Sequence, residues 1–307
     1  MRKMKHTLFI VLASFTLTSC TQDELTEQGT ALPEGAYPLE FTARVSGNIQ
    51  ARATVDDTWK SGDNIVLKTN NGDEEYIYQY DGASWNALGN TCYWQNTLPL
   101  AVTAYSYGGK ATGSFAVSDN QSTADAYQSG DYLYAQKEFV FDNDNSLEFY
   151  HQTSQIVVHI RNRGFAQGQQ NISLQIGYDN NLAISGNFTP PTSTNNYGTW
   201  DTSNGTKAVV TPYNIGTQNI MVDDNTAEIS VASFSALVIP QTISAGQKLF
   251  CVMIEGYSPF YYTVPSGDIS WQAGYRYTYN LSLTANGTIT VDNAIGLPGG
   301  WTDEEEL

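Results

Sequence analysis

The residue with the clearest chemical potential is Cys20, because its thiol stands directly after a predicted cleavage site. Residues 17–20 read Leu-Thr-Ser-Cys, and the small side chains before the cysteine let a peptidase approach the backbone. An apolar run at residues 8–17 follows a basic start, which is the organisation of a signal peptide, and the run is too short to span a bilayer. The Cys20 thiol could accept a diacylglycerol before cleavage makes this residue the new N-terminus.

Residues 17–20 resemble the bacterial lipoprotein signal. Residues 1–19 are therefore predicted to be removed, leaving an exported protein anchored by lipid at Cys20. The alternative is an ordinary secretory signal followed by an unrelated cysteine. Residues 21–24 read Thr-Gln-Asp-Glu and resemble the acidic tag that sends some lipoproteins to the outer face of the outer membrane. We therefore expect a surface-exposed lipoprotein of the outer membrane.

The rest of the sequence offers little catalytic chemistry. His151 and His159 would lie about 27 Å apart on one extended segment, too far to share a metal or a proton relay. No nucleophile elbow, phosphate-binding loop or dinucleotide fingerprint is present. Residues 142–145 read Asp-Asn-Asp-Asn, but they lack the glycine and glutamate of a helix-loop-helix calcium loop, so a turn is expected. We predict no catalytic residue, no enzyme activity, no metal and no cofactor.

Charge restricts the possible partners. The chain has 14 basic and 31 acidic residues, and its net charge of −17 becomes −20 when Arg2, Lys3 and Lys5 leave with the signal. Nucleic acid is nearly excluded as a partner, because phosphate binding needs a basic patch. In so acidic a chain, paired carboxylates are no sign of glycosidase chemistry.

Two other residue types leave alternatives open. Cys92 and Cys251 could form a disulfide between the two halves of the chain, although buried thiols acting as small hydrophobes fit their apolar surroundings better. The tryptophans could stack on sugar rings or simply close the ends of β-sandwiches; they are Trp59, Trp85, Trp94, Trp200, Trp271 and Trp301.

The elements that must position these residues are predicted to be strands, because tyrosines are numerous and amphipathic helical patterns are missing. Residues 20–38 are polar with several glycines and prolines, which predicts a flexible tether, with order beginning at residue 39. In residues 39–46, Leu39, Phe41, Ala43 and Val45 alternate with polar residues, the period of a strand with one buried face.

Short strands then recur at roughly ten-residue spacing, closed by Asn-Gly or Asp-Gly turns, as in a sandwich or barrel. Residues 113–130 are polar and predict a surface excursion. The pattern breaks at residues 161–170, which predicts an N-terminal domain at 39–163 and a C-terminal domain at 164–307. In the second domain, residues 227–231 and 236–239 read as separate strands, and the alternation at residues 275–283 ends in an Asn-Gly hairpin.

The chain resembles the fimbrillin family, the lipoprotein pilins of type V pili, over most of residues 39–301. The resemblance rests on the order of several motifs: the signal at Cys20, Arg-Ala-Thr at 52–54, Trp-Lys-Ser-Gly-Asp-Asn-Ile at 59–65, Tyr-Trp at 93–94, Asp-Tyr-Leu-Tyr-Ala at 131–135, Phe-Tyr-His-Gln at 149–152, and Gly-Tyr-Arg-Tyr-Thr-Tyr at 274–279 with Trp301.

This resemblance implies an all-β fold of two tandem β-sandwich domains, transthyretin-like and Greek-key, with little helix. It also implies assembly by strand exchange, in which an arginine-specific protease removes the first strand and a neighbouring subunit fills the groove. The removed strand would contain Leu39, Phe41, Ala43 and Val45, and the cut would follow Arg52 or, as the second choice, Arg44. The incoming strand would carry Ile289, Val291 and Ile295.

The function implied is that of a structural or adhesive fimbrial subunit, whose partners are other pilus subunits, the outer membrane and a surface receptor. The chain departs from the polymerising pattern at residues 302–307, which are acidic where a donor strand should alternate. The alternative is therefore a surface lipoprotein that does not polymerise and binds glycans through aromatic side chains.

Overall fold

The protein is almost entirely β-structure. The computed structural model describes residues 29–46, 58–106, 113–163, 171–192, 195–222, 227–284, 288–292 and 302–304. Within these ranges the single helix is α1 (Ala124–Gln128), whose N-cap Thr123 accepts a hydrogen bond from the Ala126 amide. None of the described helices has the length and apolarity needed to cross a membrane. The all-β class predicted from the sequence is confirmed.

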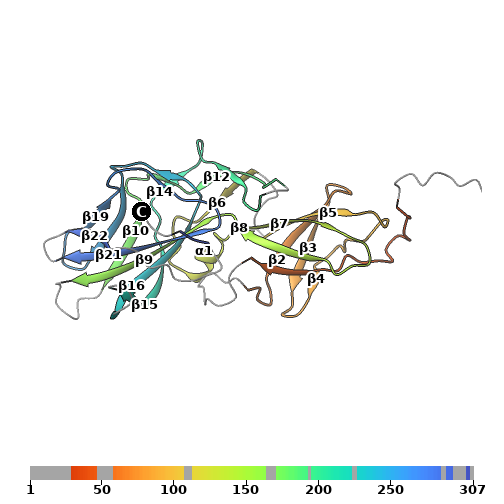
Figure 1. Cartoon of the computed structure of the whole chain (residues 1–307), viewed down its shortest axis with the longest axis horizontal. Coiled ribbons are helices and arrows are strands. Elements are labelled where there is room, and N and C mark those ends of the chain that lie inside the picture. The colour runs from red at the N-terminus through yellow and green to blue at the C-terminus, as the bar shows by residue number, and fades with distance from the viewer. Residues whose placement is uncertain are drawn as a thin grey trace, which may run out of the picture.

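Two groups of sheets lie end to end along the long axis (Figure 1). The first, called here the N-terminal half, is a seven-stranded sheet in the order β1-β8-β7-β5-β2-β3-β4. Its neighbours are antiparallel except β1 and β8, which run parallel. Its strands are β1 (Thr42–Val45), β2 (Asn64–Thr69), β3 (Glu75–Tyr80), β4 (Trp85–Ala87), β5 (Leu100–Ser106), β7 (Leu133–Phe139) and β8 (Ser146–His151).

The C-terminal half is built around a six-stranded sheet, β15-β16-β9-β21-β22 with β23 beside β21, which packs against a three-stranded sheet, β10-β18-β19. Short pairs β11-β14 and β17-β20 and a third sheet, β13-β12-β6, complete it. The strands are β6 (Gly113–Ala116), β9 (Ser154–Arg163), β10 (Ile172–Ile176), β11 (Leu182–Ala183), β12 (Ser185–Thr189), β13 (Thr199–Asp201), β14 (Lys207–Ala208), β15 (Tyr213–Val222), β16 (Ala227–Val238), β17 (Thr242–Ile243), β18 (Lys248–Ile254), β19 (Phe260–Thr263), β20 (Ile269–Ser270), β21 (Tyr275–Thr284), β22 (Ile289–Asp292) and β23 (Thr302–Glu304).

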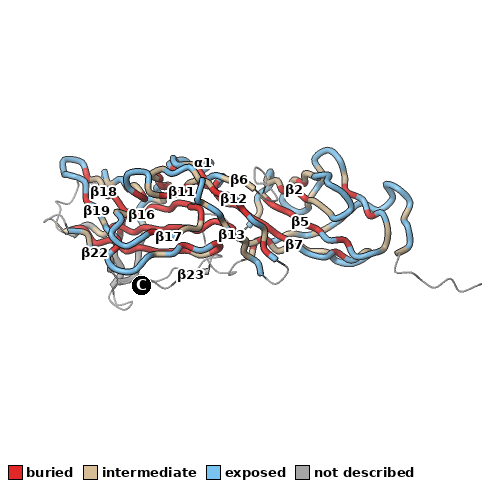
Figure 2. The backbone as a smooth tube through the Cα atoms, turned by 90° about the horizontal axis from the view of Figure 1, so that it is seen from above, coloured by how far each residue is buried: buried red, intermediate tan, exposed pale blue. Residues whose placement is uncertain are grey.

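Each half has its own hydrophobic core, and the buried stretches of backbone run along the inside of both (Figure 2). In the C-terminal half, β9 and β21 lie side by side in parallel at the centre of the large sheet. Ile156 and Val158 of β9 are fully buried, as expected of a central strand whose apolar residues face a packed layer.

Strand β9 belongs to the C-terminal half, although the division predicted after residue 163 assigns it to the N-terminal domain. It pairs with β16 and β21 and so forms part of the C-terminal sheet. Strand pairing between distant segments leaves no mark in a local pattern, which is why the break at residues 161–170 was misleading. Independent folding of two domains stays a prediction.

Residues 113–130 run largely over the surface, as their polarity predicts, but the segment also contains a strand and several buried anchoring residues. Strand β6 pairs with β12, and Phe115 stacks on Tyr132 with a centroid distance of 4.8 Å. Beyond it, the Gln121 side chain donates to the Leu237 carbonyl at 2.7 Å, and Tyr127 is buried. This segment therefore fastens the two halves to each other.

Ordered contacts also begin before residue 39. Ala31 and Pro38 form β-bridges to Asn96 and Tyr93. The Leu32 amide donates to the Gln95 carbonyl at 2.9 Å. The expectation that residues 29–38 belong to a free tether is wrong, because their backbone groups pair with residues 92–97 despite a composition typical of linkers.

Candidate functional site

The candidate site is the edge strand β1 with the core that it covers. Leu39 and Val45 are only 3% and 7% exposed, and Phe41 and Ala43 are half-buried against the same core. The intervening residues at 40, 42 and 44 are exposed. The strand itself is shorter than the predicted residues 39–46, since Ala43 and Val45 belong to β1 whereas Leu39 and Phe41 precede it. All four side chains nevertheless pack against the same core, with the alternation expected of an extended chain.

Phe41 inserts into a group of aromatic rings contributed by three other strands, β3, β4 and β7. Its ring centroid lies 5.1 Å from that of Tyr78, 6.4 Å from Trp85 and 6.2 Å from Phe139. Trp59 packs edge-on against Trp85 at 5.0 Å. Removing β1 would open this aromatic core to solvent, at a cost of roughly 1.5–3 kcal/mol for each large side chain that loses its cover.

The backbone of β1 is fixed from one side. Thr42, Ala43, Arg44 and Val45 lie opposite residues 146–149 of β8, and the strand stands at the end of the sheet order. Its ends are closed by hydrogen bonds from the Thr42 amide to the Asn145 carbonyl, 3.0 Å, and from the Ser46 amide to the Phe149 carbonyl, 2.7 Å. A strand at the edge of a sheet can be exchanged without dismantling the strands behind it.

Of the two candidate cleavage residues, Arg44 lies within the described part of the chain and Arg52 does not. The Arg44 side chain is 75% exposed and lies 3.1 Å from the Glu148 carboxylate. Its neighbour Val45 is buried in the core, so a protease that cuts after Arg44 must first pull Val45 out. Arg52 lies outside the described residues, as do the lipidation residue Cys20 and residues 47–57 in general.

The predicted donor residues lie in the other half. Ile289 and Val291 belong to β22, which pairs with β21, and both pack against the C-terminal core. Ile295 falls outside the described residues. The displaced strand and the donor strand are therefore not brought together within this chain: they stand in opposite halves (Figure 1).

Both histidines have structural partners. His151 Nδ1 lies 2.7 Å from Asp131 Oδ1, and His159 Nδ1 lies 2.7 Å from Ser233 Oγ. Burial lowers the pKa of His159 to about 4, so its ring is neutral near pH 7. They lie in different sheets, on β8 and β9, and both serve the packing of the fold. Cys92 and Cys251 are buried and free.

The C-terminal half contains a pocket that the sequence did not predict. It has a volume of about 940 Å³, and its lining includes Trp200, Trp271, Tyr197 and Tyr275. Of the six tryptophans considered for sugar stacking, Trp200 and Trp271 line this pocket, and the two tyrosines beside them are 78 residues apart in the sequence. No local spacing could have revealed that they meet.

The architecture defines a class of tandem β-sandwich proteins whose N-terminal core is closed by an edge strand. The sequence pattern of the fimbrillin-like family matches residues 51–296, and the chain belongs to this family. Membership supports a role as a pilus or adhesin subunit at the cell surface. A search of curated proteins finds no match.

Two solved structures share the fold. A proposed cell adhesion protein from Bacteroides uniformis superposes with a TM-score of 0.58 at 18% identity, covering 85% of this chain and 97% of its own. Another, from Bacteroides ovatus, gives a TM-score of 0.57 at 17% identity, with coverage of 85% and 97%. At such identities the likeness concerns the fold.

Proposed function

We propose that this chain is the precursor of a fimbrial subunit that polymerises by donor-strand exchange after proteolysis at Arg52. The observation that carries the proposal is the edge strand β1, which covers an aromatic core with alternating side chains yet has one pairing strand, β8, in the described part of the chain.

The exchange follows from effective concentration. While β1 is covalently attached, it occupies its groove intramolecularly and outcompetes strands of other molecules. After a cut between β1 and β2, the same strand is held by non-covalent contacts alone, and a donor strand competes with it by mass action. A donor that supplies apolar side chains at alternate positions and pairs with β8 satisfies both the core and the backbone.

Arg52 is the better cleavage residue on physical grounds. A protease binds an extended stretch of backbone that is not tied into a sheet, whereas Val45 beside Arg44 is buried. Arg52 stands seven residues beyond the end of β1 and twelve before the start of β2. A cut there leaves β1 intact as a displaceable strand.

The donor is proposed to come from β22 and the residues after it, carrying Ile289, Val291 and Ile295. Strand β22 is itself at an edge, and its pairing with β21 spans four residue pairs. Two edge strands, one in each half of the subunit, give a head-to-tail interface of the heterologous type, which extends into a fibre. The lipid at Cys20 is proposed to bring the precursor to the outer membrane.

The test is digestion of purified precursor with an arginine-specific protease, followed by size measurement of wild type and Arg52→Ala. Wild type should be cut after Arg52 and form oligomers, whereas Arg52→Ala should remain monomeric. An Arg44→Ala variant is the matched control and should behave as wild type. The mechanism is wrong if the cut wild type stays monomeric, or if Arg52→Ala assembles equally well.

A further inference from the structure

The pocket of the C-terminal half lies between the short strand pairs on one side of the molecule. It is formed by β13 and β14, by the pair β17-β20, and by the first residue of β21. Its volume of about 940 Å³ is at the upper end of the range for small-molecule sites, about 300–1,000 Å³. The space is sufficient for several sugar rings.

The lining is polar and carries little charge. Amide and hydroxyl side chains predominate, and Lys207 is the one charged residue among those that line the pocket. Thr199 and Gln272 present exposed polar ends to the space. Amides and hydroxyls both donate and accept hydrogen bonds, so this surface suits a ligand whose groups do the same.

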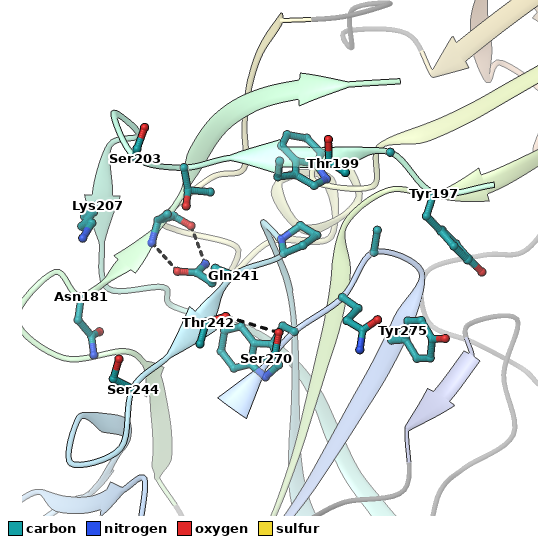
Figure 3. Close-up of a pocket in the computed structure, with 18 of the residues that line it drawn as sticks. Asn181, Tyr197, Thr199, Ser203, Lys207, Gln241, Thr242, Ser244, Ser270 and Tyr275 are labelled. Carbon is teal, nitrogen blue, oxygen red and sulfur yellow. Dashed lines mark hydrogen bonds between the residues drawn. The ribbon is translucent and has the colours of Figure 1, made fainter. Parts of the chain in front are cut away.

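Part of this polar wall is held rigidly. The Ala183 amide donates to Gln241 Oε1 at 2.8 Å, and Gln241 Nε2 donates back to the Ala183 carbonyl at 2.9 Å, as the dashed lines in Figure 3 show. Trp271, which also lines the pocket, is fixed by a hydrogen bond from its indole nitrogen to the Tyr279 hydroxyl at 3.0 Å. A wall fixed by such bonds loses little conformational freedom on binding.

One end of the pocket carries two aromatic rings. Tyr197 and Tyr275 are half-buried, their ring centroids are 6.3 Å apart, and both stand at the end opposite Lys207 (Figure 3). Gly274, at a φ of +78°, makes this possible, because a Cβ there would come within 2.2 Å of the Tyr197 ring. Tyr197 is further supported edge-on by Tyr150 at 6.0 Å.

From these features we infer that the pocket binds a neutral oligosaccharide. The rings of Tyr197 and Tyr275 are inclined by 44° to each other, so each stacks on the flat C–H face of a separate sugar ring, while the sugar hydroxyls bond to the amide and hydroxyl side chains along the wall. A neutral ligand is favoured because the pocket offers one cation and the chain as a whole is strongly acidic, which disfavours anionic glycans.

The pocket binds without cleaving. Glycoside hydrolysis in its usual form needs two carboxyl groups on either side of the scissile bond, and the residues that line this pocket include neither Asp nor Glu. The site is independent of strand exchange, since it lies in the half that does not contain β1. A subunit could thus carry its receptor site whether or not it polymerises.

The experiment is calorimetric titration of the full chain with four neutral hexasaccharides, from α-1,4-glucan, β-1,4-glucan, β-1,4-mannan and β-1,4-xylan, beside an anionic hexamer of galacturonic acid. At least one neutral probe should bind with a millimolar or tighter dissociation constant. Tyr197→Ala should weaken that binding by about tenfold or more, because a stacked ring contributes on this scale.

Three further variants distinguish the loss of ligand contacts from a general loss of stability. Tyr197→Phe keeps the stacking face and should retain binding, whereas Gln272→Ala, an exposed wall residue, should weaken it in a protein of unchanged thermal stability. Tyr257→Ala removes a tyrosine that is 44% exposed outside the pocket and should change nothing. Binding of no neutral probe, preference for the galacturonate, or equal loss with Tyr257→Ala would each overturn the inference.

Discussion

Arg44 and Glu148 join the edge strand β1 to its neighbour β8, with Arg44 Nη2 3.1 Å from Glu148 Oε2. Burial alone would raise the pKa of the Glu148 carboxyl, but hydrogen bonds from Arg44 and Ser46 and the charge of Arg44 hold it below its ordinary value. Both side chains are well exposed, so the pair contributes at most about 1 kcal/mol. The edge strand is therefore held mainly by its inward face.

The first prediction follows from this weak outer contact. Arg44→Ala should lower the free energy of unfolding by less than about 1 kcal/mol at pH 7 in low salt, and by still less at high salt. The contribution of Glu148 is present above the ordinary carboxyl pKa and is lost as pH falls through the lowered folded pKa. Urea unfolding of wild type and Arg44→Ala at two ionic strengths measures this change in the free energy of unfolding. A loss of several kcal/mol would mean that the pair, rather than the core, secures β1.

Phe41 should matter far more than Arg44. Phe41→Asp places a carboxylate among Tyr78, Trp85 and Phe139 and should destabilise the precursor by at least roughly 1.5 kcal/mol. Thr42→Asp, on the exposed face of the same strand, is the matched control and should change the free energy of unfolding little. Equal urea midpoints for the two variants would show that β1 is not packed as described.

His159 gives a prediction on pH. Its pKa is about 4 in the folded chain because burial penalises the charged ring, against an ordinary value of 6.5. The unfolded chain therefore binds more protons between these two values, and stability falls as pH drops from 6.5 toward 4. The full loss corresponds to about 3 kcal/mol, since one unit of pKa is worth about 1.4 kcal/mol.

The measurement compares wild type with His159→Gln by urea unfolding at pH 7 and pH 4.5. The variant should show a smaller loss of stability between the two pH values, even if it is less stable at pH 7 because the bond to Ser233 changes. If both proteins lose the same free energy, protonation of another group governs the acid response.

Local pattern predicted the strands that alternate cleanly and missed those that do not. Strands β1 and β21 are predictable because apolar side chains recur every second residue in 39–46 and 275–283, although β1 itself spans only Thr42–Val45. Strand β16 was read as two pieces because Ser233 and Ser235 interrupt its apolar pattern, yet both serines are buried. The Ser233 hydroxyl lies 2.7 Å from His159 Nδ1, and the Ser235 hydroxyl lies 2.6 Å from the Tyr127 hydroxyl. A local sequence pattern cannot predict partners so distant in the sequence.

The candidate site was predictable to a similar extent. The inward face of β1 follows from alternation, whereas its parallel pairing with β8 and the rings around Phe41 depend on contacts over about 40 to 100 residues. Tyr197 and Tyr275 meet because Gly274 leaves space for a ring, and although Tyr275 belongs to the motif at residues 274–279, nothing in that motif points to Tyr197.

Cys20 remains the predicted lipid attachment residue. Cys20→Ala should leave the precursor uncleaved and remove the protein from membrane fractions, because no thiol is available to accept the diacylglycerol. Cys92→Ala is the control and should not change fractionation, since Cys92 is buried. Mass spectrometry of the N-terminus and Triton partitioning report the outcome. Unchanged retention of Cys20→Ala in membranes would exclude lipidation at this residue.

A disulfide that ties β1 to β8 tests strand exchange most directly. Thr42 and Ser146 face each other in the register of the two strands, and both belong to the outward-facing set. Paired residues on adjacent strands lie about 5 Å apart at Cα, within the range that a disulfide spans. Thr42→Cys with Ser146→Cys should therefore crosslink without disturbing the core, and burial raises the pKa of the native thiols Cys92 and Cys251, which keeps them unreactive.

With the disulfide formed, proteolysis at Arg52 should still cut the chain, but β1 cannot leave and the subunits should stay monomeric. Reduction of the same cut sample should then release β1 and allow oligomers to grow, which makes each sample its own control. Either single-cysteine variant should assemble like wild type in both states. Assembly of the oxidised, cut double variant would mean that subunits join without vacating the β1 groove, and the exchange mechanism would be wrong for this chain.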